Sequence, residues 1–332
     1  MKKVLGSLLA GLMICAAPMA LPSAADAAHP LAITATAGPV AGTGYIGMAA
    51  LGKVYASQNA ADGASVTMVP GSDVSNPLRL EKGEVDAAVQ TMALAVCARE
   101  GQAPFKKVVS NLNSIANIRN NSRLNIVVRS DSGITSLDQL KEKKMSIRLA
   151  TGPRGSASEV MGKWVLDAYG ITYKDITSWG GKLFSNNFGD VANMAKDGQV
   201  DMMFWVGPGE AWFFTELISG TALTWLPVKP EVAKIVKEKY NLNDCVFEST
   251  MFGGKMGKNV PGVATSQQVM VRSGVSEDVA YRLTKAFCEG AQDVIAANPV
   301  WGTFKPETAW QGLTHELHPG AVKFYKEKGW MK

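Results

Sequence analysis

Cysteine is scarce in this 332-residue sequence, which contains four cysteines and no C-x-x-C pair. The spacing excludes a zinc ribbon and a thioredoxin-type motif. Cys15 lies in an N-terminal apolar segment, so Cys97, Cys245 and Cys288 remain for the folded chain. Two arrangements stay open: a disulfide between Cys245 and Cys288 with Cys97 free, or three small core residues.

Long apolar runs, low-complexity segments and dense Lys/Arg stripes are also missing after the first 28 residues. The first absence argues against a transmembrane helix, and the third argues against nucleic acid as a partner. A hydrophobic content of 46% and a charged content of 19% are typical of a globular protein. The net charge of +5 is mild and is compatible with an anionic ligand.

The N-terminus has the three parts of a secretory signal peptide. Lys2 and Lys3 precede an apolar stretch over residues 4–17, and residues 25–28 read Ala-Asp-Ala-Ala. About 20 apolar residues are needed to span a bilayer, so this stretch is too short. The residue before Cys15 is Ile14 rather than a small residue, which argues against lipidation. We expect cleavage after Ala27 and export to the periplasm; an uncleaved membrane anchor is the alternative.

Strands and helices alternate through the first part of the mature chain. Apolar or β-branched runs predict strands at residues 31–36, 65–69 and 85–89, and capping and periodicity predict helices at 45–57 and 72–82. This order is typical of a parallel α/β sheet.

The alternation then begins again. Strands are predicted at 124–129 and 145–150, and two S-x-x-E/Q patterns, Ser136 with Gln139 and Ser156 with Glu159, predict capping boxes for helices at 137–141 and up to residue 169. A late strand at 266–272, a long amphipathic helix at 275–297 and short C-terminal helices follow.

A weak internal repeat indicates two similar lobes. Residues 81–86 (Glu-Lys-Gly-Glu-Val-Asp) and residues 196–201 (Lys-Asp-Gly-Gln-Val-Asp) each precede an apolar strand. The length fits two domains of about 150 residues. We therefore expect one lobe of residues 28–128 and 266–332, and a second lobe of residues 129–265.

Residues 42–47 form a G-x-G-x-x-G motif between a strand and a helix, which is the pattern of a dinucleotide-binding loop. Asp73 follows the second strand, roughly where a ribose-binding acid would lie. A signal peptide argues against a nicotinamide cofactor, and no hydride-transfer site is evident. The simpler interpretation is a helix N-terminus whose backbone N–H groups bind a carboxylate or phosphate.

Two further loops should meet the first at the carboxyl ends of the strands. Residues 151–156 are again Gly-rich and contain Arg154, whose guanidinium could bind a carboxylate. Residues 71–76 offer hydroxyl, amide and N–H donors, and Gln90 and Trp205 close matching strands. The candidate ligand-binding residues are Gly42, Thr43, Gly44, Tyr45, Ser72, Asn76, Gln90, Arg154, Gly155, Ser156, Trp205 and Gly207.

Catalytic machinery is not evident. The sequence has no G-x-S-x-G elbow, Ser156 has no obvious base, and nothing forms a triad. His315 and His318 lack nearby metal-ligating residues, so we expect surface histidines. We expect no catalytic residue, no metal and no cofactor.

With these residues in place, the chain resembles the TAXI-type solute receptors of tripartite ATP-independent periplasmic (TRAP) transporters. The matching stretches are residues 34–47, 71–80, 83–90, 127–141, 152–156, 198–201 and 260–263. Glu142, Arg154 and the Ala157-Ser158 pair depart from the pattern, so the ligand could differ from those of better-known members.

The resemblance implies a type II periplasmic binding protein, with two α/β lobes joined by two crossing strands. It implies a small carboxylate ligand, similar to glutamate or 2-oxoglutarate, held between closing lobes and delivered to integral-membrane TRAP subunits. The receptor of an ATP-driven (ABC) importer is the alternative, and a dinucleotide-dependent oxidoreductase is a weaker one.

Overall fold

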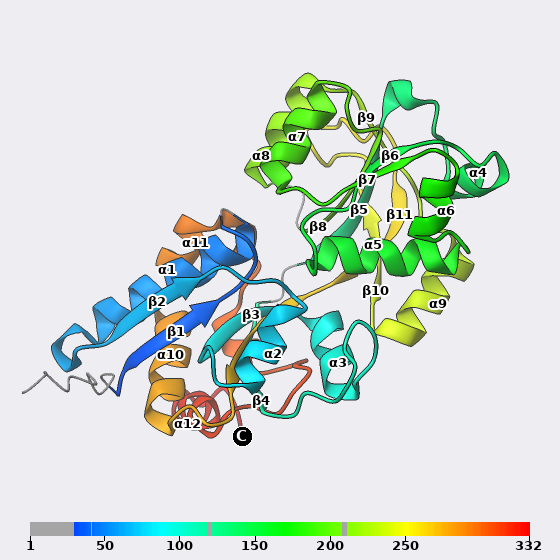
Figure 1. Ribbon diagram of the computed structural model, residues 1–332. Helices are drawn as coiled ribbons and strands as arrows, with labels where there is room; N and C mark the ends of the chain where they lie inside the picture. Colours follow the sequence, from blue (N-terminus) through cyan, green and yellow to red (C-terminus); the bar gives the residue numbers. More distant parts are fainter. Residues whose placement is uncertain (1–29, 41, 119–120, 208–210) are drawn as a thin grey trace, which may run out of the picture.

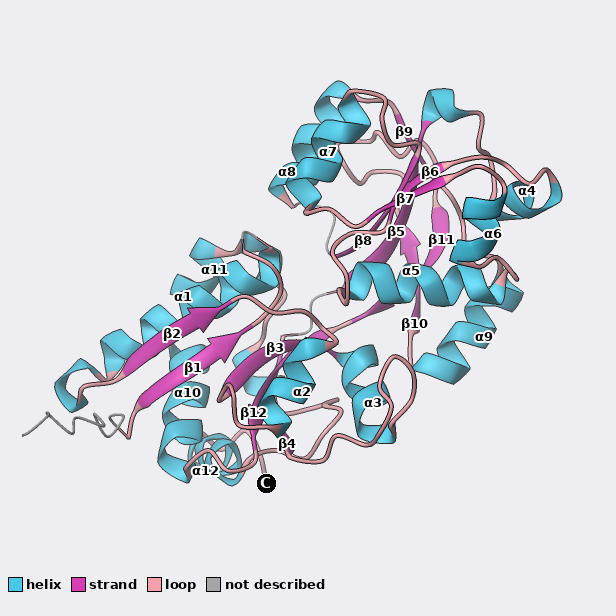
Figure 2. Cartoon of the chain, in the orientation of Figure 1, coloured by secondary structure: helices cyan, strands magenta, loops and turns pink. Residues whose placement is uncertain are grey.

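A computed structural model describes residues 30–40, 42–118, 121–207 and 211–332. The predicted signal peptide, residues 1–27, lies outside this part of the chain. The described residues form two lobes, each a mixed sheet with helices on both faces (Figures 1 and 2). None of the helices described is long and apolar enough to cross a membrane. The predicted two-lobed α/β class is confirmed.

The first lobe contains a five-stranded sheet in the order β2-β1-β3-β12-β4. β1 is parallel to β2 and β3, whereas β12 is antiparallel to β3 and β4. The strands are β1 (Ala32–Thr36), β2 (Ser65–Val69), β3 (Ala87–Thr91), β4 (Leu112–Asn117) and β12 (Gln267–Arg272). The helices are α1 (Thr43–Gln58), α2 (Ser75–Glu81), α3 (Met92–Glu100), α10 (Glu277–Glu289), α11 (Ala291–Ala297) and α12 (Pro319–Glu327).

The second lobe contains a seven-stranded sheet in the order β10-β11-β5-β8-β6-β7, with β9 paired to β5. Its strands are β5 (Ser122–Arg129), β6 (Arg148–Ala150), β7 (Lys182–Phe184), β8 (Met202–Gly207), β9 (Leu223–Trp225), β10 (Asn243–Phe247) and β11 (Val260–Thr265). Its helices are α4 (Leu137–Glu142), α5 (Ala157–Ala168), α6 (Tyr173–Ser178), α7 (Phe188–Lys196), α8 (Trp212–Gly220) and α9 (Pro230–Tyr240).

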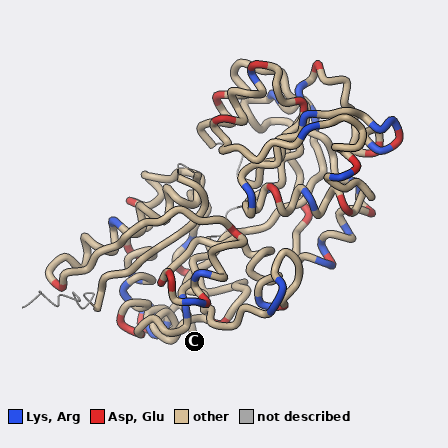
Figure 3. Tube along the Cα trace, in the orientation of Figure 1, with Lys and Arg blue, Asp and Glu red and all other residues tan. Residues whose placement is uncertain are grey.

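Three buried apolar clusters hold these layers together. One lies under α1, α10 and α12 in the first lobe, one lies under α7 and α8 in the second, and a third joins both lobes. The third includes Leu94 of α3, Trp164 of α5 and Val236 of α9, so apolar packing continues across the junction. Basic and acidic residues are spread over the outer surfaces of both lobes (Figure 3).

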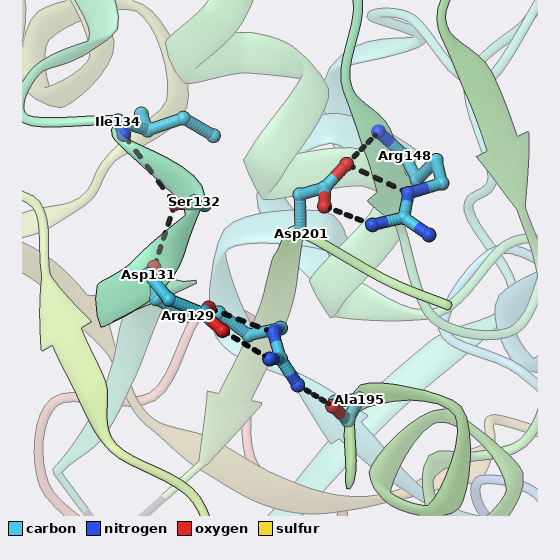
Figure 4. Close-up of polar contacts among 7 residues, drawn as sticks. All are labelled: Arg129, Asp131, Ser132, Ile134, Arg148, Ala195 and Asp201. Carbon is cyan, nitrogen blue, oxygen red and sulfur yellow. Dashed lines mark hydrogen bonds and ion pairs between the residues drawn. The ribbon is translucent and has the colours of Figure 1, made fainter. Parts of the chain in front are cut away.

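The predicted repeat corresponds to a repeat in structure. The order β7-β6-β8-β5-β11 copies β2-β1-β3-β12-β4, with the same parallel and antiparallel pairs. In the first lobe the Thr34 N–H donates to Asp86 Oδ2 at 2.8 Å, and the Asp86 N–H donates to Thr34 O at 2.8 Å. In the second lobe the Arg148 N–H donates to Asp201 Oδ2 at 2.8 Å (Figure 4), and the Asp201 N–H donates to Arg148 O at 2.9 Å.

Several expected details differ from the structure. The predicted helix at 275–297 is interrupted at Gly290, between α10 and α11, where a Cβ would lie 2.4 Å from Val54 Cγ1 and only glycine fits. Each predicted capping box forms only its first half. Ser156 Oγ accepts from the Glu159 N–H, but the Glu159 carboxylate accepts from the Gly155 N–H rather than from the cap residue. Gln139 likewise accepts from Thr135.

The chain changes sheet at two places. The expected boundary at residue 128 lies inside β5, which belongs entirely to the second sheet, so the first change falls between Asn117 and Ser122. The reason is strand pairing, because β5 pairs with β8 from Arg123 to Val128. The second change lies at Ser266, between β11 and β12.

The three described cysteines are all free. Cys245 belongs to the second sheet and Cys288 to α10 of the first lobe, so the disulfide left open by the sequence does not form. Burial raises the pKa of the Cys97 and Cys288 thiols to about 12. These thiols are therefore unreactive at neutral pH.

Candidate functional site

A cleft between the two lobes is the candidate functional site. The first lobe contributes the N-terminal end of α1 and the strands β3 and β12 to its walls. The second lobe contributes the N-terminal end of α5, the strand β8 and the helix α8. The lining residues are Gly38, Pro39, Gly42, Thr43, Gly44, Asp73, Val89, Thr91, Ser156, Ala157, Ser158, Phe188, Trp205, Val206, Phe213 and Gln267. The cleft lies where the carboxyl ends of β1, β3, β6 and β8 meet, which is the usual ligand position in open α/β sheets.

The α1 end supplies backbone N–H groups. Gly42 is the N-cap and makes no side-chain cap bond, and a helix leaves the N–H groups of its first turn without intrahelical partners. Gly44 lines the cleft, and a Cβ there would lie 3.6 Å from Val89. The α1 end therefore offers partial positive charge at a point where a small ligand can approach the backbone.

The α5 end binds a carboxylate that belongs to the protein itself. The Ala157 N–H donates to Asp73 Oδ2 at 2.8 Å, across the junction between lobes. The Thr91 N–H donates to Asp73 Oδ1 at 3.1 Å from the first lobe. Burial raises the pKa of Asp73 above its usual value, and these hydrogen bonds offset only part of that rise. Asp73 thus links both lobes and occupies a position where the sequence predicts a ligand's anionic group.

A second bond across the junction supports the same contact. The Val74 N–H donates to Gly155 O at 3.0 Å, and a Cβ on Gly155 would lie 2.9 Å from Ser72 Oγ. Gly155 has a φ of +73°, a conformation that favours glycine. The 71–76 and 151–156 loops therefore meet each other rather than a ligand alone.

Aromatic side chains of the second lobe form one wall of the cleft. The Trp205 and Phe213 rings pack edge to face at a centroid distance of 5.2 Å, and Phe188 stacks on Phe213 at 5.2 Å. The sequence predicts Trp205 from its place after a strand. It gives no comparable signal for Phe188 and Phe213, whose roles depend on the approach of α7 and α8.

Five predicted residues line the cleft together: Gly42, Thr43, Gly44, Ser156 and Trp205. Tyr45, Ser72, Asn76, Gln90, Arg154, Gly155 and Gly207 do not. Asn76 is buried and bonds to Ala37 O at 2.9 Å, and its carbonyl accepts from the Ser72 N–H at 3.1 Å. Gln90 donates to Asp73 O at 3.0 Å. The Asn76 and Gln90 side chains therefore hold the 71–76 loop in place without facing the cleft.

Arg154 lies away from the cleft. It is exposed and borders a separate depression, together with Trp164 of α5 and Tyr173 of α6. The chain turns at Gly155, so that Ser156 and the residues after it line the cleft and Arg154 does not.

The third glycine of G-x-G-x-x-G serves packing. A Cβ on Gly47 would lie 2.4 Å from the Trp301 ring and 2.6 Å from Asn298 Nδ2. His318, expected at the surface, is instead buried: its Nδ1 accepts from the Gly320 N–H at 3.3 Å and caps α12. Within the described residues, no group of three or more His, Cys, Asp or Glu could hold a metal ion.

The architecture is that of a two-lobed periplasmic binding protein. The chain belongs to the NMT1-like family, whose model matches residues 34–329.

Solved structures of low sequence identity share the fold. The periplasmic binding protein BugD aligns with a TM-score of 0.53 and 14% identity, over 90% of this chain and 95% of its own. XAC2383 from Xanthomonas citri, bound to ATP, aligns with a TM-score of 0.52 and 13% identity, over 90% of this chain and 95% of its own. PhnD1 from Prochlorococcus marinus, in complex with methylphosphonate, aligns with a TM-score of 0.51 and 13% identity, over 82% of this chain and 90% of its own.

Proposed function

We propose that this chain is an exported solute-binding receptor that captures a small carboxylate between its lobes and delivers it to a membrane transporter. The observation that supports this most directly is the convergence of two helix N-termini, one from each lobe, on a single cleft. One of them already binds a carboxylate, that of Asp73. Helix N-termini favour anions through their unpaired N–H groups and their dipoles.

The partner that we propose is a pair of TRAP membrane subunits, on the strength of the sequence resemblance. The second candidate is an ABC importer, since its receptors share this fold. Collapsing the ion gradient in cells with maintained ATP separates them. Uptake that stops supports the TRAP partner, whereas uptake that continues supports the importer.

A dinucleotide-dependent oxidoreductase fits the cleft poorly. The Asp73 carboxylate already accepts hydrogen bonds from the Thr91 and Ala157 N–H groups, so it is not free to bind a ribose hydroxyl. We therefore propose a binding role without catalysis. We also propose that the mature chain acts in the periplasm, which the signal-peptide pattern at the N-terminus supports.

A thermal-shift screen of the chain from Ala28 onward tests the proposal. The panel contains glutamate, 2-oxoglutarate, succinate, phosphate, ethanesulfonate, methylphosphonate and NAD. A ligand that binds only the folded protein at 100 times its Kd stabilises it by about 2.7 kcal/mol. A raised Tm with a carboxylate is expected; a rise with NAD alone would favour the oxidoreductase, and a rise with methylphosphonate alone would change the solute class.

A further inference from the structure

Ion pairing divides the arginines of the described chain into two groups. Six form an ion pair with an aspartate or glutamate: Arg79, Arg99, Arg129, Arg148, Arg272 and Arg282. Arg123 and Arg154 have no carboxylate within ion-pairing distance among the residues that the structure describes. A guanidinium is charged at every pH at which proteins fold, so neither of these two has a counter-charge within the described part of the chain.

The surroundings of these two arginines differ. Arg154 is exposed, and water solvates its charge. Arg123 is half-buried, and its Nε is enclosed without a hydrogen-bond partner in the described chain. Its guanidinium lies over the Phe247 ring at 5.9 Å, a cation–π contact that supplies no negative counter-charge. Enclosing a donor without a partner costs free energy, so Arg123 is the arginine that an added anion would stabilise.

Arg123 does not itself line the cleft, but it lies near the end of β5 that pairs with the last residues of β8, next to the cleft-lining Trp205 and Val206. It is the second residue of β5, directly after the chain enters this lobe, and it pairs with Gly207 at the end of β8. Asn125, two residues further along β5, pairs with Trp205. Directly paired residues of antiparallel strands share a face, so Arg123 and the cleft-lining Trp205 are diagonal neighbours on one face. Such neighbours lie about 7–8 Å apart, within reach of long side chains.

Because Gly207 has no side chain, the Trp205 ring can lie directly over it. A Cβ there would lie 2.6 Å from Trp205 Cζ2 and 3.2 Å from Trp205 Nε1. The indole edge, including its N–H donor, thus lies over the glycine that faces Arg123 across the strand pair. Asn125 holds this part of the sheet, since its side-chain amide donates to both Arg123 O and Trp205 O at 3.2 Å.

We propose that Arg123 binds the anionic group of the solute and thereby sets the specificity of the cleft. The inference rests on the proposed function and names the residue that recognises the charge. Arg123 would approach the anion from β5, with the Trp205 N–H beside it, while the N–H groups of α1 would approach from the first lobe. A carboxylate, sulfonate or phosphonate would supply the counter-charge that this guanidinium lacks, and a neutral amide would not.

The test compares Arg123→Gln with Arg154→Gln in the full mature chain. Calorimetry measures the Kd of glutamate, 2-oxoglutarate, ethanesulfonate and methylphosphonate, with glutamine as the neutral-side-chain counterpart of glutamate. Arg123→Gln should raise the Kd of every anion that the wild type binds by about 30-fold or more. Arg154→Gln should leave each Kd within about twofold, since its charge is already solvated. Arg123→Lys should fall between, because an ammonium keeps the charge without the planar fork.

Unliganded stability separates binding from folding. Because Arg123 lacks a partner, Arg123→Gln should leave the Tm without ligand unchanged or raise it, whereas a structural arginine would lower it. Unchanged anion affinity in Arg123→Gln, or a loss confined to Arg154→Gln, overturns the role of Arg123. If the wild type binds only the sulfonate or phosphonate and Arg123→Gln loses that binding, the role of Arg123 stands and the carboxylate proposal fails. A wild type that binds none of the anions overturns both.

Discussion

Single residues in the first Gly-rich loop serve different ends although they share one motif. Gly44 lets the cleft approach the α1 backbone, whereas Gly47 lets α1 approach Trp301 and Asn298. A motif match cannot separate these uses, because it records only that a glycine is present, whereas a Cβ would meet ordinary contacts at Gly44 and a clash at Gly47. Only the neighbours of each glycine assign its role.

Gly47→Ala should therefore destabilise the fold. The new methyl group would overlap the fully buried Trp301 ring, and overpacking of this kind costs about 1–3 kcal/mol. Urea unfolding measures the loss. Gly220→Ala is the control, because a Cβ there meets nothing within 4 Å, and we expect a change below about 0.5 kcal/mol. Equal effects of the two substitutions would contradict the packing role.

At the scale of elements, the two lobes use one device to join a loop to its sheet. Asp86 lies between β1 and β12, and Asp201 lies between β6 and β5. Each accepts a backbone N–H from one neighbouring strand through its side chain and donates its own N–H back. An arginine then pairs with each carboxylate: Arg272 Nε with Asp86 at 2.9 Å, and Arg148 Nε with Asp201 at 3.0 Å.

Asp86→Asn and Asp201→Asn should destabilise the protein to a similar extent. Each loses charge-assisted bonds in a partly buried position, at a cost of about 1–3 kcal/mol. Denaturant unfolding of both variants checks this. Asp131→Asn provides the control, because Asp131 pairs with Arg129 on the surface (Figure 4), and its loss should be much smaller. A large difference between Asp86→Asn and Asp201→Asn would show that the repeat is not equivalent in energy.

For the molecule as a whole, Asp73 connects the lobes. Its carboxylate accepts one N–H from each lobe, and the neighbouring Val74 N–H donates to Gly155 O. Two-lobed proteins exist as ensembles of open and closed forms, and a contact present only on closure shifts that equilibrium. The Asp73 bonds therefore bias the unliganded chain toward the arrangement seen here.

Asp73→Asn should open the unliganded protein. An asparagine presents its NH₂ group to one of the two N–H donors, so one bond is lost. Small-angle scattering should give a larger radius of gyration than for the wild type. Glu159→Gln is the matched control, because Glu159 bonds to the Gly155 N–H within one lobe and makes no bridge. An unchanged radius in Asp73→Asn would remove Asp73 from lobe positioning.

The sequence by itself determined the local elements and the lobes. Strand β2 over Ser65–Val69 and the start of α5 after Ser156 follow from alternation and from a capping serine, which depend on nearby residues. The repeat around Asp86 and Asp201 was visible for the same reason. Five cleft residues could be predicted because helix N-termini and strand ends can be located along the chain. The close packing of Gly290 against Val54 of α1 could not, because it joins two helices that are far apart in the sequence.

Only the tertiary structure decided which charges meet the cleft. The Asp73 carboxylate binds the N–H at the α5 end, Arg154 is exposed, and Arg123 pairs with Gly207, two residues from the cleft-lining Trp205. These outcomes depend on how two lobes, far apart in sequence, pack and pair. The periodicity of a chain encodes which face of an element is buried, but the counter-charge of a side chain is supplied by whichever residue the fold brings beside it.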